Sequence, residues 1–132
     1  GWTVEGRFGE QDIGWHGRTS VPTTLLKLTE ELTAGLRRPP QVIGDETRAV
    51  NRIAWCTGGA QSLFEEAISQ GVDAYVSGEI SEQSVHLARE SGVAYIAAGH
   101  HATEQFGVQA LAAHLVERFG LECEFVDIDN PV

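Results

Sequence analysis

The feature that most constrains the fold of this chain is an alternation of apolar runs and helical patterns from residue 50 onward. The apolar runs, each of strand length, cover residues 50–56, 73–77, 93–98 and 122–128. Apolar side chains at helical spacing occupy the intervals, at residues 63–68, 81–90 and 102–119. Strands that alternate with helices predict parallel strands joined by crossovers. We therefore expect an α/β fold, a three-layer sandwich with a mostly parallel sheet.

The N-terminal part of the chain gives weaker signals. Residues 1–21 hold five glycines with scattered aromatic side chains, which predicts an irregular N-terminal arm or an extended edge segment. Ser20 and Pro22 resemble the start of a helix, and leucines recur at helical spacing until Pro39. Residues 41–44 predict a short strand. We expect residues 22–132 to form a single α/β domain.

Composition excludes several classes of protein. A chain of 132 residues with 42% apolar and 21% charged residues can bury the core of one globular domain. No apolar run approaches the roughly 20 residues of a membrane span, so we expect no membrane association. The net charge of −10 disfavours nucleic acid as a partner. Cys56 and Cys123 lie in apolar runs and are predicted to be buried thiols of a reducing, cytoplasmic protein.

A candidate metal site lies at the start of the last helical pattern. In the run Gly-His-His-Ala-Thr-Glu, His100 and Glu104 stand four residues apart and project from one face of a helix. An imidazole and a carboxylate can hold a divalent ion, with zinc, manganese, iron, cobalt and nickel all compatible. The alternative is a solvated helix start, in which Glu104 only interacts with the helix dipole.

The expected topology places this motif at a binding edge. Three predicted strands end in glycine-bearing segments, at residues 57–59, 77–79 and 99–101. Ligands of such sheets bind outside the carboxyl ends of the strands. Glu79 follows the second of these strands, where it is a candidate general base, an outer partner of a metal ligand, or a helix-start charge. Asp127 and Asp129 can cap a turn as easily as reach the site.

Four motifs in this order resemble the Nif-three-like family, whose members are also named GTP cyclohydrolase type-two homologues or dinuclear metal-binding proteins. The motifs occupy residues 52–62, 71–83, 98–104 and 125–131. The resemblance implies two interlinked, similar domains, a ring-shaped homohexamer and two divalent metal ions. It implies that His100 and Glu104 are metal ligands. The family's remaining ligands belong to motifs that this chain lacks, so the chain resembles the C-terminal part of a longer two-domain protein.

The resemblance also implies a function. We expect a dinuclear-metal-dependent hydrolase acting on a small molecule, with His101 as a proton shuttle or substrate contact and Glu79 as a candidate general base. The alternative is a non-catalytic, metal-binding ring that serves as a scaffold or a regulatory protein-interaction module.

Overall fold

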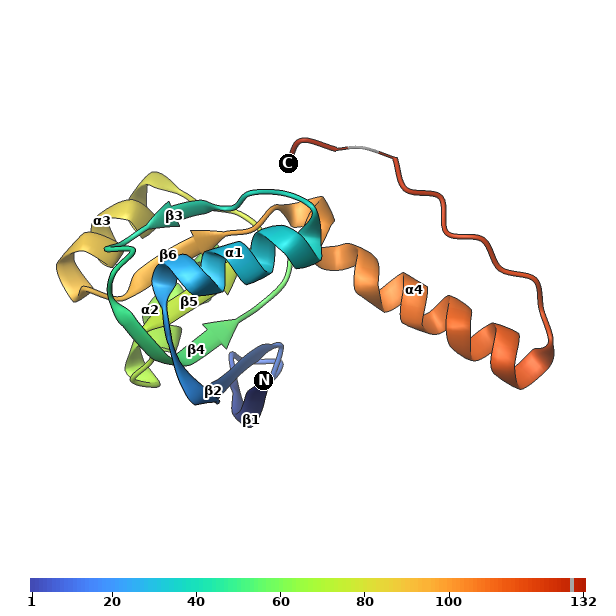
Figure 1. Cartoon of the computed structure of the whole chain (residues 1–132), viewed down its shortest axis with the longest axis horizontal. Helices are drawn as coiled ribbons and strands as arrows, with labels where there is room; N and C mark the ends of the chain where they lie inside the picture. The colour runs from blue at the N-terminus through green and yellow to red at the C-terminus, as the bar shows by residue number, and fades with distance from the viewer. Residues whose placement is uncertain (129) are drawn as a thin grey trace.

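The computed structural model describes residues 1–128 and 130–132 (Figure 1). Within these residues the chain forms six strands, four α-helices and one 3₁₀ turn. In chain order they are β1 (Trp2–Phe8), β2 (Gly14–Thr24), α1 (Leu25–Leu36), β3 (Gln41–Ile43), β4 (Ala49–Trp55), η1 (Gln61–Leu63), α2 (Phe64–Ser69), β5 (Ala74–Ser77), α3 (Glu82–Ser91), β6 (Ala94–Ala97) and α4 (His100–Phe119).

The six strands form one mixed sheet in the order β1-β2-β4-β5-β6-β3. The three central strands β4, β5 and β6 are parallel, as the alternation of strands and helices predicts. The outer strands all pair antiparallel, β1 with β2, β2 with β4, and β3 with β6. The α/β class is therefore confirmed, with the parallel part confined to the centre of the sheet rather than extending over most of it.

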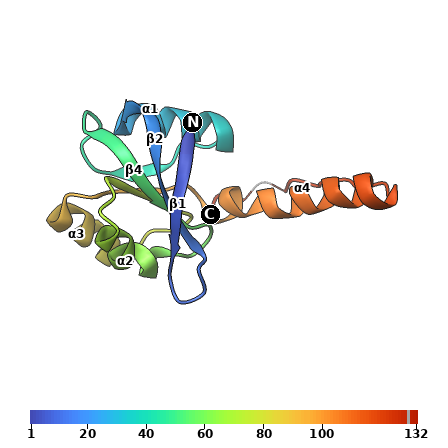
Figure 2. The same ribbon diagram turned by 90° about the horizontal axis from the view of Figure 1, so that it is seen from below.

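Helices cover both faces of the sheet, α1 on one side and α2 with α3 on the other (Figure 2). Successive side chains of the central strands alternate between these two layers because a strand turns its residues to opposite faces. Val76 packs in the apolar cluster under α1, whereas Tyr75 packs in the cluster under α2 and α3. There the Tyr75 ring stacks on Phe64, with centroids 5.5 Å apart. The central strands are thus buried on both faces.

Residues 1–21 form a β-hairpin rather than the irregular arm predicted as one alternative. β1 pairs with β2, and the long β2 continues the sheet onto β4. The irregular N-terminal arm predicted for residues 1–21 is therefore wrong. The helix also begins later than Ser20 and Pro22 indicate, because both lie within β2 and Thr24 caps α1 by accepting a hydrogen bond from the Lys27 amide.

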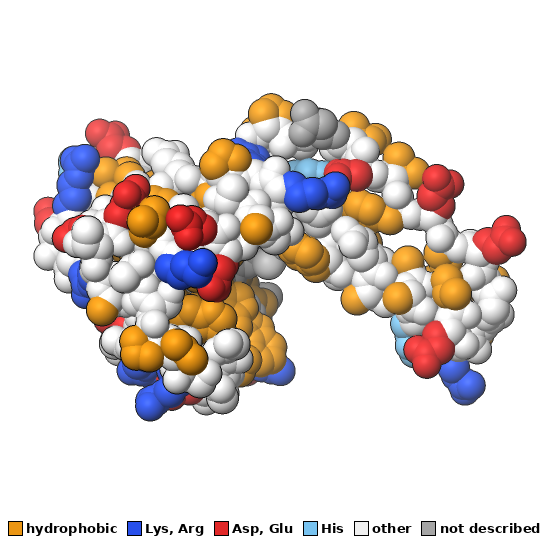
Figure 3. All heavy atoms as spheres, viewed as in Figure 1, with side chains coloured by type: hydrophobic (Ala, Val, Ile, Leu, Met, Phe, Trp, Pro, Cys, Tyr) orange, Lys and Arg blue, Asp and Glu red, His pale blue; other side chains and the backbone are white. Residues whose placement is uncertain are grey.

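The last helix leaves the domain. α4 projects away from the sheet. The tail, which follows α4 from residue 120, runs back beside this helix (Figures 1 and 2). Only Ala102 and Thr103 of α4 are buried. Apolar side chains remain exposed along the helix and the tail (Figure 3), among them Phe106, Val108, Leu111, Phe119, Val126 and Ile128.

The tail differs from two sequence predictions. Residues 122–128 form no strand, although their apolar run predicts one. Cys123 is exposed, whereas Cys56 is buried as predicted. None of the helices in the described part of the chain combines the length and the apolar character needed to cross a membrane.

Candidate functional site

The candidate site is built on three segments that follow the parallel strands. The amide of Gly78, after β5, donates to the carbonyl of Gly58, after β4, at 2.9 Å. The amide of Gly99, after β6, donates to the carbonyl of Gly78, also at 2.9 Å. These hydrogen bonds extend the pairing of the parallel strands beyond their ends. The three glycine-bearing segments therefore lie side by side at one edge of the sheet, as the sequence predicted.

The first turn of α4 is anchored to this edge by Thr103. Its hydroxyl accepts a hydrogen bond from the Gly58 amide at 3.1 Å and donates to the Gly99 carbonyl at 2.9 Å. Thr103 is buried, so water does not compete strongly for either of these hydrogen bonds. Sequence patterns gave no signal for this role of Thr103. The anchor fixes where His100 and Glu104, on either side of it in the sequence, project from the helix.

His100 lies between two carboxylates. Its Nε2 atom is 3.1 Å from Oε2 of Glu104, four residues along α4, as the helical spacing predicts. Its Nδ1 atom is 2.5 Å from Oε1 of Glu79, which comes from the segment after β5. Both ring nitrogens therefore face an acidic oxygen. The contact with Glu79 joins residues 21 apart in the sequence and follows from the register of β5 and β6.

The two carboxylates change the acid–base properties of the imidazole. The hydrogen bond with Glu79 raises the pKa of His100 above its usual value, and the charge of Glu104 acts in the same direction against partial burial. The same hydrogen bond lowers the pKa of Glu79. Both side chains are about one-third exposed, His100 at 38% and Glu79 at 36%. A metal ion at Nε2 must therefore compete with a proton, because the two carboxylates favour protonation of the ring.

Gly58 makes room for the Glu104 carboxylate beside His100. A Cβ atom at Gly58 would overlap the Glu104 carboxylate and lie 3.2 Å from Nε2 of His100. An imidazole nitrogen and a carboxylate oxygen 3.1 Å apart are suitable donors for a first-row divalent ion. Within residues 1–128 and 130–132, however, no three His, Cys, Asp or Glu side chains gather as a ligand set. The pair fits a metal ion as part of a site whose other ligands come from elsewhere.

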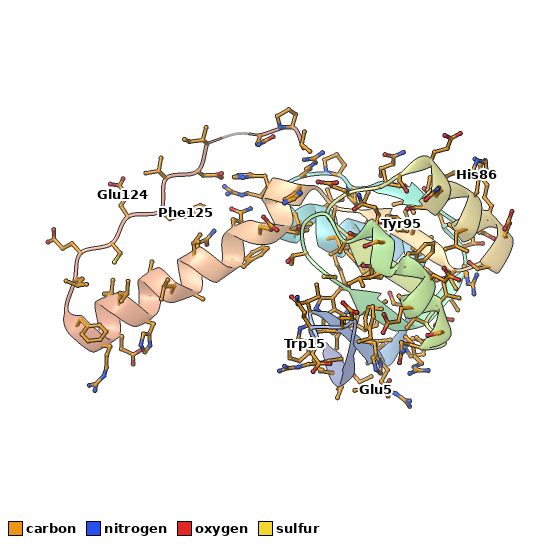
Figure 4. The ribbon with its side chains drawn as sticks, turned by 180° about the vertical axis from the view of Figure 1, so that it is seen from behind. Glu5, Trp15, His86, Tyr95, Glu124 and Phe125 are labelled. Atoms are coloured by element: carbon orange, nitrogen blue, oxygen red, sulfur yellow. The ribbon has the colours of Figure 1, made fainter. Side chains whose placement is uncertain are left out.

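His101 lies beside this pair and points to the tail. Its Nε2 atom is 3.2 Å from Oδ1 of Asp127, and Asp127 also contacts Arg37, which follows α1, at 3.2 Å. His100, His101 and Glu104 line one side of an open cavity of about 460 Å³, whose other side is formed by tail residues including Phe125. Figure 4 shows Phe125 on the tail beside α4, far from Tyr95 in the body of the domain. The predicted role of Asp129 lies outside the described residues.

Comparison with known proteins agrees with the resemblance seen in the motifs. The family model for Duf34/NIF3 (NGG1p interacting factor 3) matches residues 3–131. A protein named GTP cyclohydrolase 1 type 2 homolog from Allochromatium vinosum is 56% identical over 117 residues, which are 89% of this chain and 46% of that protein. A protein of the same name from Escherichia coli K12 is 46% identical over 132 residues, 99% of this chain and 53% of the relative.

Solved structures show the same fold. Protein ybgI, of unknown function, superposes with a TM-score of 0.91 at 43% identity, over 100% of this chain and 53% of its own. Protein TTHA1606 from Thermus thermophilus superposes with a TM-score of 0.78 at 30% identity, over 89% of this chain and 46% of its own. The chain thus spans about half the length of the relatives that it matches. This chain belongs to the Duf34/NIF3 family.

Proposed function

We propose that this chain supplies two ligands, His100 and Glu104, to a divalent metal centre of a hydrolase. The observation that carries the proposal is the close approach of Nε2 of His100 to Oε2 of Glu104, 3.1 Å apart, at the carboxyl ends of the parallel strands. A Cβ atom at Gly58 would overlap the Glu104 carboxylate and disturb that approach. A helix start that only used Glu104 to interact with the dipole would need no imidazole partner.

The centre is proposed to be dinuclear and completed by the part of the protein that corresponds to the other half of its relatives' length. Two donors from this chain are too few for the four or more ligands that such ions take. When bound, paired divalent ions supply Lewis acidity and lower the pKa of water for hydrolysis. Zinc, manganese, iron, cobalt and nickel all accept this mixed donor set.

The neighbouring side chains suit a small, polar substrate. His101 lines the same cavity as the ligand pair, so its imidazole can accept or return a proton beside the reacting group. Its contact with Asp127 at 3.2 Å orients the ring. The name GTP cyclohydrolase 1 type 2 homolog, carried by the curated relatives, suggests a nucleotide ring as the group that is hydrolysed.

The exposed apolar surface favours a second candidate function, an interaction module. Beside the start of α4, an apolar cavity of about 460 Å³ includes Trp2, Trp55 and Phe106 in its lining. Exposed apolar side chains also continue along α4 to Phe119. Apolar surface of this kind marks contacts with other protein surfaces. A homohexameric ring that binds metal without catalysis would use the same features.

The substitution Glu104→Gln tests the metal proposal. It keeps the size of the side chain and removes the charged oxygen, so the affinity for zinc or manganese should fall at least about tenfold while circular dichroism stays unchanged. Glu117→Gln is the matched control, because Glu117 is an exposed carboxylate on the same helix. Equal metal affinity of the two variants, measured by calorimetry, would show that Glu104 is not a metal ligand.

The enzyme proposal needs a separate test. Hydrolysis of nucleotides should be measured on the protein extended to the length of its relatives, with metal added and removed. Activity that requires metal and is lost in Glu104→Gln supports the hydrolase. Metal binding without turnover of any nucleotide tested would support the interaction module instead.

A further inference from the structure

We propose that Glu79 is a positioning residue, which holds the His100 ring so that Nε2 faces the metal position. This inference rests on the proposed function, since it concerns the same ligand. It differs from the role of general base that the sequence allowed for Glu79. Contacts on both sides of the Glu79 carboxylate support it.

The first contact determines which nitrogen of His100 carries hydrogen. A neutral imidazole has one N–H donor and one nitrogen with a free lone pair. Nδ1 of His100 lies 2.5 Å from Oε1 of Glu79, a distance that requires a hydrogen on Nδ1 because the carboxylate only accepts. Nδ1 is then committed to Glu79, and Nε2, 3.1 Å from Oε2 of Glu104, is the nitrogen left for a metal ion. A carboxylate that accepts from the far nitrogen of a ligating histidine fixes its tautomer and ring orientation.

The other contacts hold Glu79 itself in place. Nε2 of Gln61, in η1, donates to Oε2 of Glu79 at 3.3 Å. The hydroxyl of Tyr95, in β6, donates to the Glu79 backbone carbonyl at 2.6 Å. Gln61 therefore holds the carboxylate of Glu79, and Tyr95 holds its backbone.

This arrangement argues for orientation rather than proton transfer. Each oxygen of Glu79 already accepts a hydrogen bond from a protein side chain, Oε1 from His100 and Oε2 from Gln61. A general base must instead reach the proton of the substrate within hydrogen-bond distance. Loss of such an orienting partner typically lowers metal affinity about 10- to 100-fold.

The experiment reads the tautomer and the affinity separately. Long-range ¹H–¹⁵N spectra of the metal-free protein at about pH 8.5, where most histidines are neutral, show which nitrogen of His100 bears hydrogen. The His100→Gln variant identifies the signals. Zinc titrations then give the affinity of wild type, Glu79→Ala and Glu79→Gln. Glu82→Gln is the control for charge, because Glu82 is an exposed carboxylate three residues away that contacts His86 instead.

We expect hydrogen on Nδ1 in wild type and in Glu82→Gln, with unchanged zinc affinity in the control. Glu79→Ala should populate the Nε2–H tautomer and weaken zinc binding about 10- to 100-fold. Glu79→Gln should restore part of both properties, since its amide oxygen can still accept from Nδ1.

Two results would overturn the inference. One is a wild type whose Nδ1 atom bears no hydrogen, and the other is a Glu79→Ala variant with the wild-type tautomer and zinc affinity. A wild-type protein whose His100 signals do not respond to zinc would instead contradict the metal proposal. In that case the tautomers of wild type and Glu79→Ala still decide whether Glu79 orients the ring.

Discussion

The substitution Gly58→Ala tests whether metal binding depends on the close approach of Glu104 to His100. Gly58 has φ +66°, and an added Cβ would overlap Oε1 of Glu104 and lie 3.0 Å from its Cδ. The backbone cannot easily yield, because the Gly58 amide donates to Thr103 and its carbonyl accepts from Gly78. The flexible, half-exposed carboxylate of Glu104 should therefore move away from His100.

The expected cost to the fold is set by the backbone. An L-residue in the left-handed region costs roughly 1–2 kcal/mol relative to glycine. Gly120, at the end of α4, has nearly the same φ of +65° but no atom within 4 Å of an added Cβ. Gly120→Ala is therefore a matched control for strain without a clash. We expect the two variants to lose similar stability, within about 0.5 kcal/mol, because a side-chain end can rotate at little cost.

Metal binding should separate the two variants. Gly58→Ala should bind zinc at least about tenfold more weakly than Gly120→Ala, equivalent to about 1.4 kcal/mol. Urea unfolding measures the stabilities, and calorimetric titration measures the affinities. Equal zinc affinity in the two variants would refute the proposed metal position. A Gly58→Ala variant far less stable than the control would show that the glycine serves packing instead.

The other predictions concern pH and association. Zinc affinity should fall as pH drops through the raised pKa of His100, because only the neutral ring binds metal, and titrations across a pH series measure this. In metal-free protein the contact with Glu79 should stabilise wild type relative to Glu79→Gln below that raised pKa. This advantage should disappear in urea unfolding as pH rises through it, and also as pH falls through the lowered pKa of Glu79. The chain alone should self-associate through α4, so Leu111→Glu should shift sedimentation toward monomer more than Leu26→Glu on α1, although the two leucines are 57% and 46% exposed.

The sequence predicted the central strands because their environment leaves a strong signal. A strand covered by helices on both faces needs an almost continuous apolar run, and β5 and β6 are buried at every position.

The sequence of the N-terminal hairpin, in contrast, was misleading about its structure. Its glycines indicate irregular chain, yet two of them make room for a side chain on the neighbouring strand. A Cβ at Gly14 would lie 2.6 Å from the Phe8 ring, and one at Gly6 would lie 2.6 Å from His16.

The prediction of a strand in the tail was wrong for a different reason. Residues 122–128 have the apolar composition of a strand, but a strand also needs a neighbour whose backbone groups it can pair with. In the structure the tail runs beside α4, which satisfies its own amides and carbonyls. Composition can predict that a segment prefers an extended conformation. It cannot show whether a sheet edge is available to that segment.

The contacts in the candidate site also differ in whether a local sequence pattern can predict them. The contact of His100 with Glu104 follows from their helical spacing, which can be read directly from the sequence. The contacts of His100 with Glu79 and of Thr103 with Gly58 join the start of α4 to the segments after β5 and β4, so they depend on the register of the strands. No local pattern could identify them. Glu79 was a candidate only because it follows a strand that was expected to end at the site.

These long-range contacts have a consequence for how the site and α4 depend on each other. Thr103 and Glu79 fix the first turn of α4 to the sheet, whereas the later turns extend away from the domain with apolar side chains exposed. The geometry of His100 and Glu104 is therefore set by the domain rather than by whatever covers the distal helix. Leu111, seven residues beyond Glu104, can change without moving the ligands. Leu111→Glu should then alter association while leaving zinc affinity unchanged, and Gly58→Ala should do the reverse.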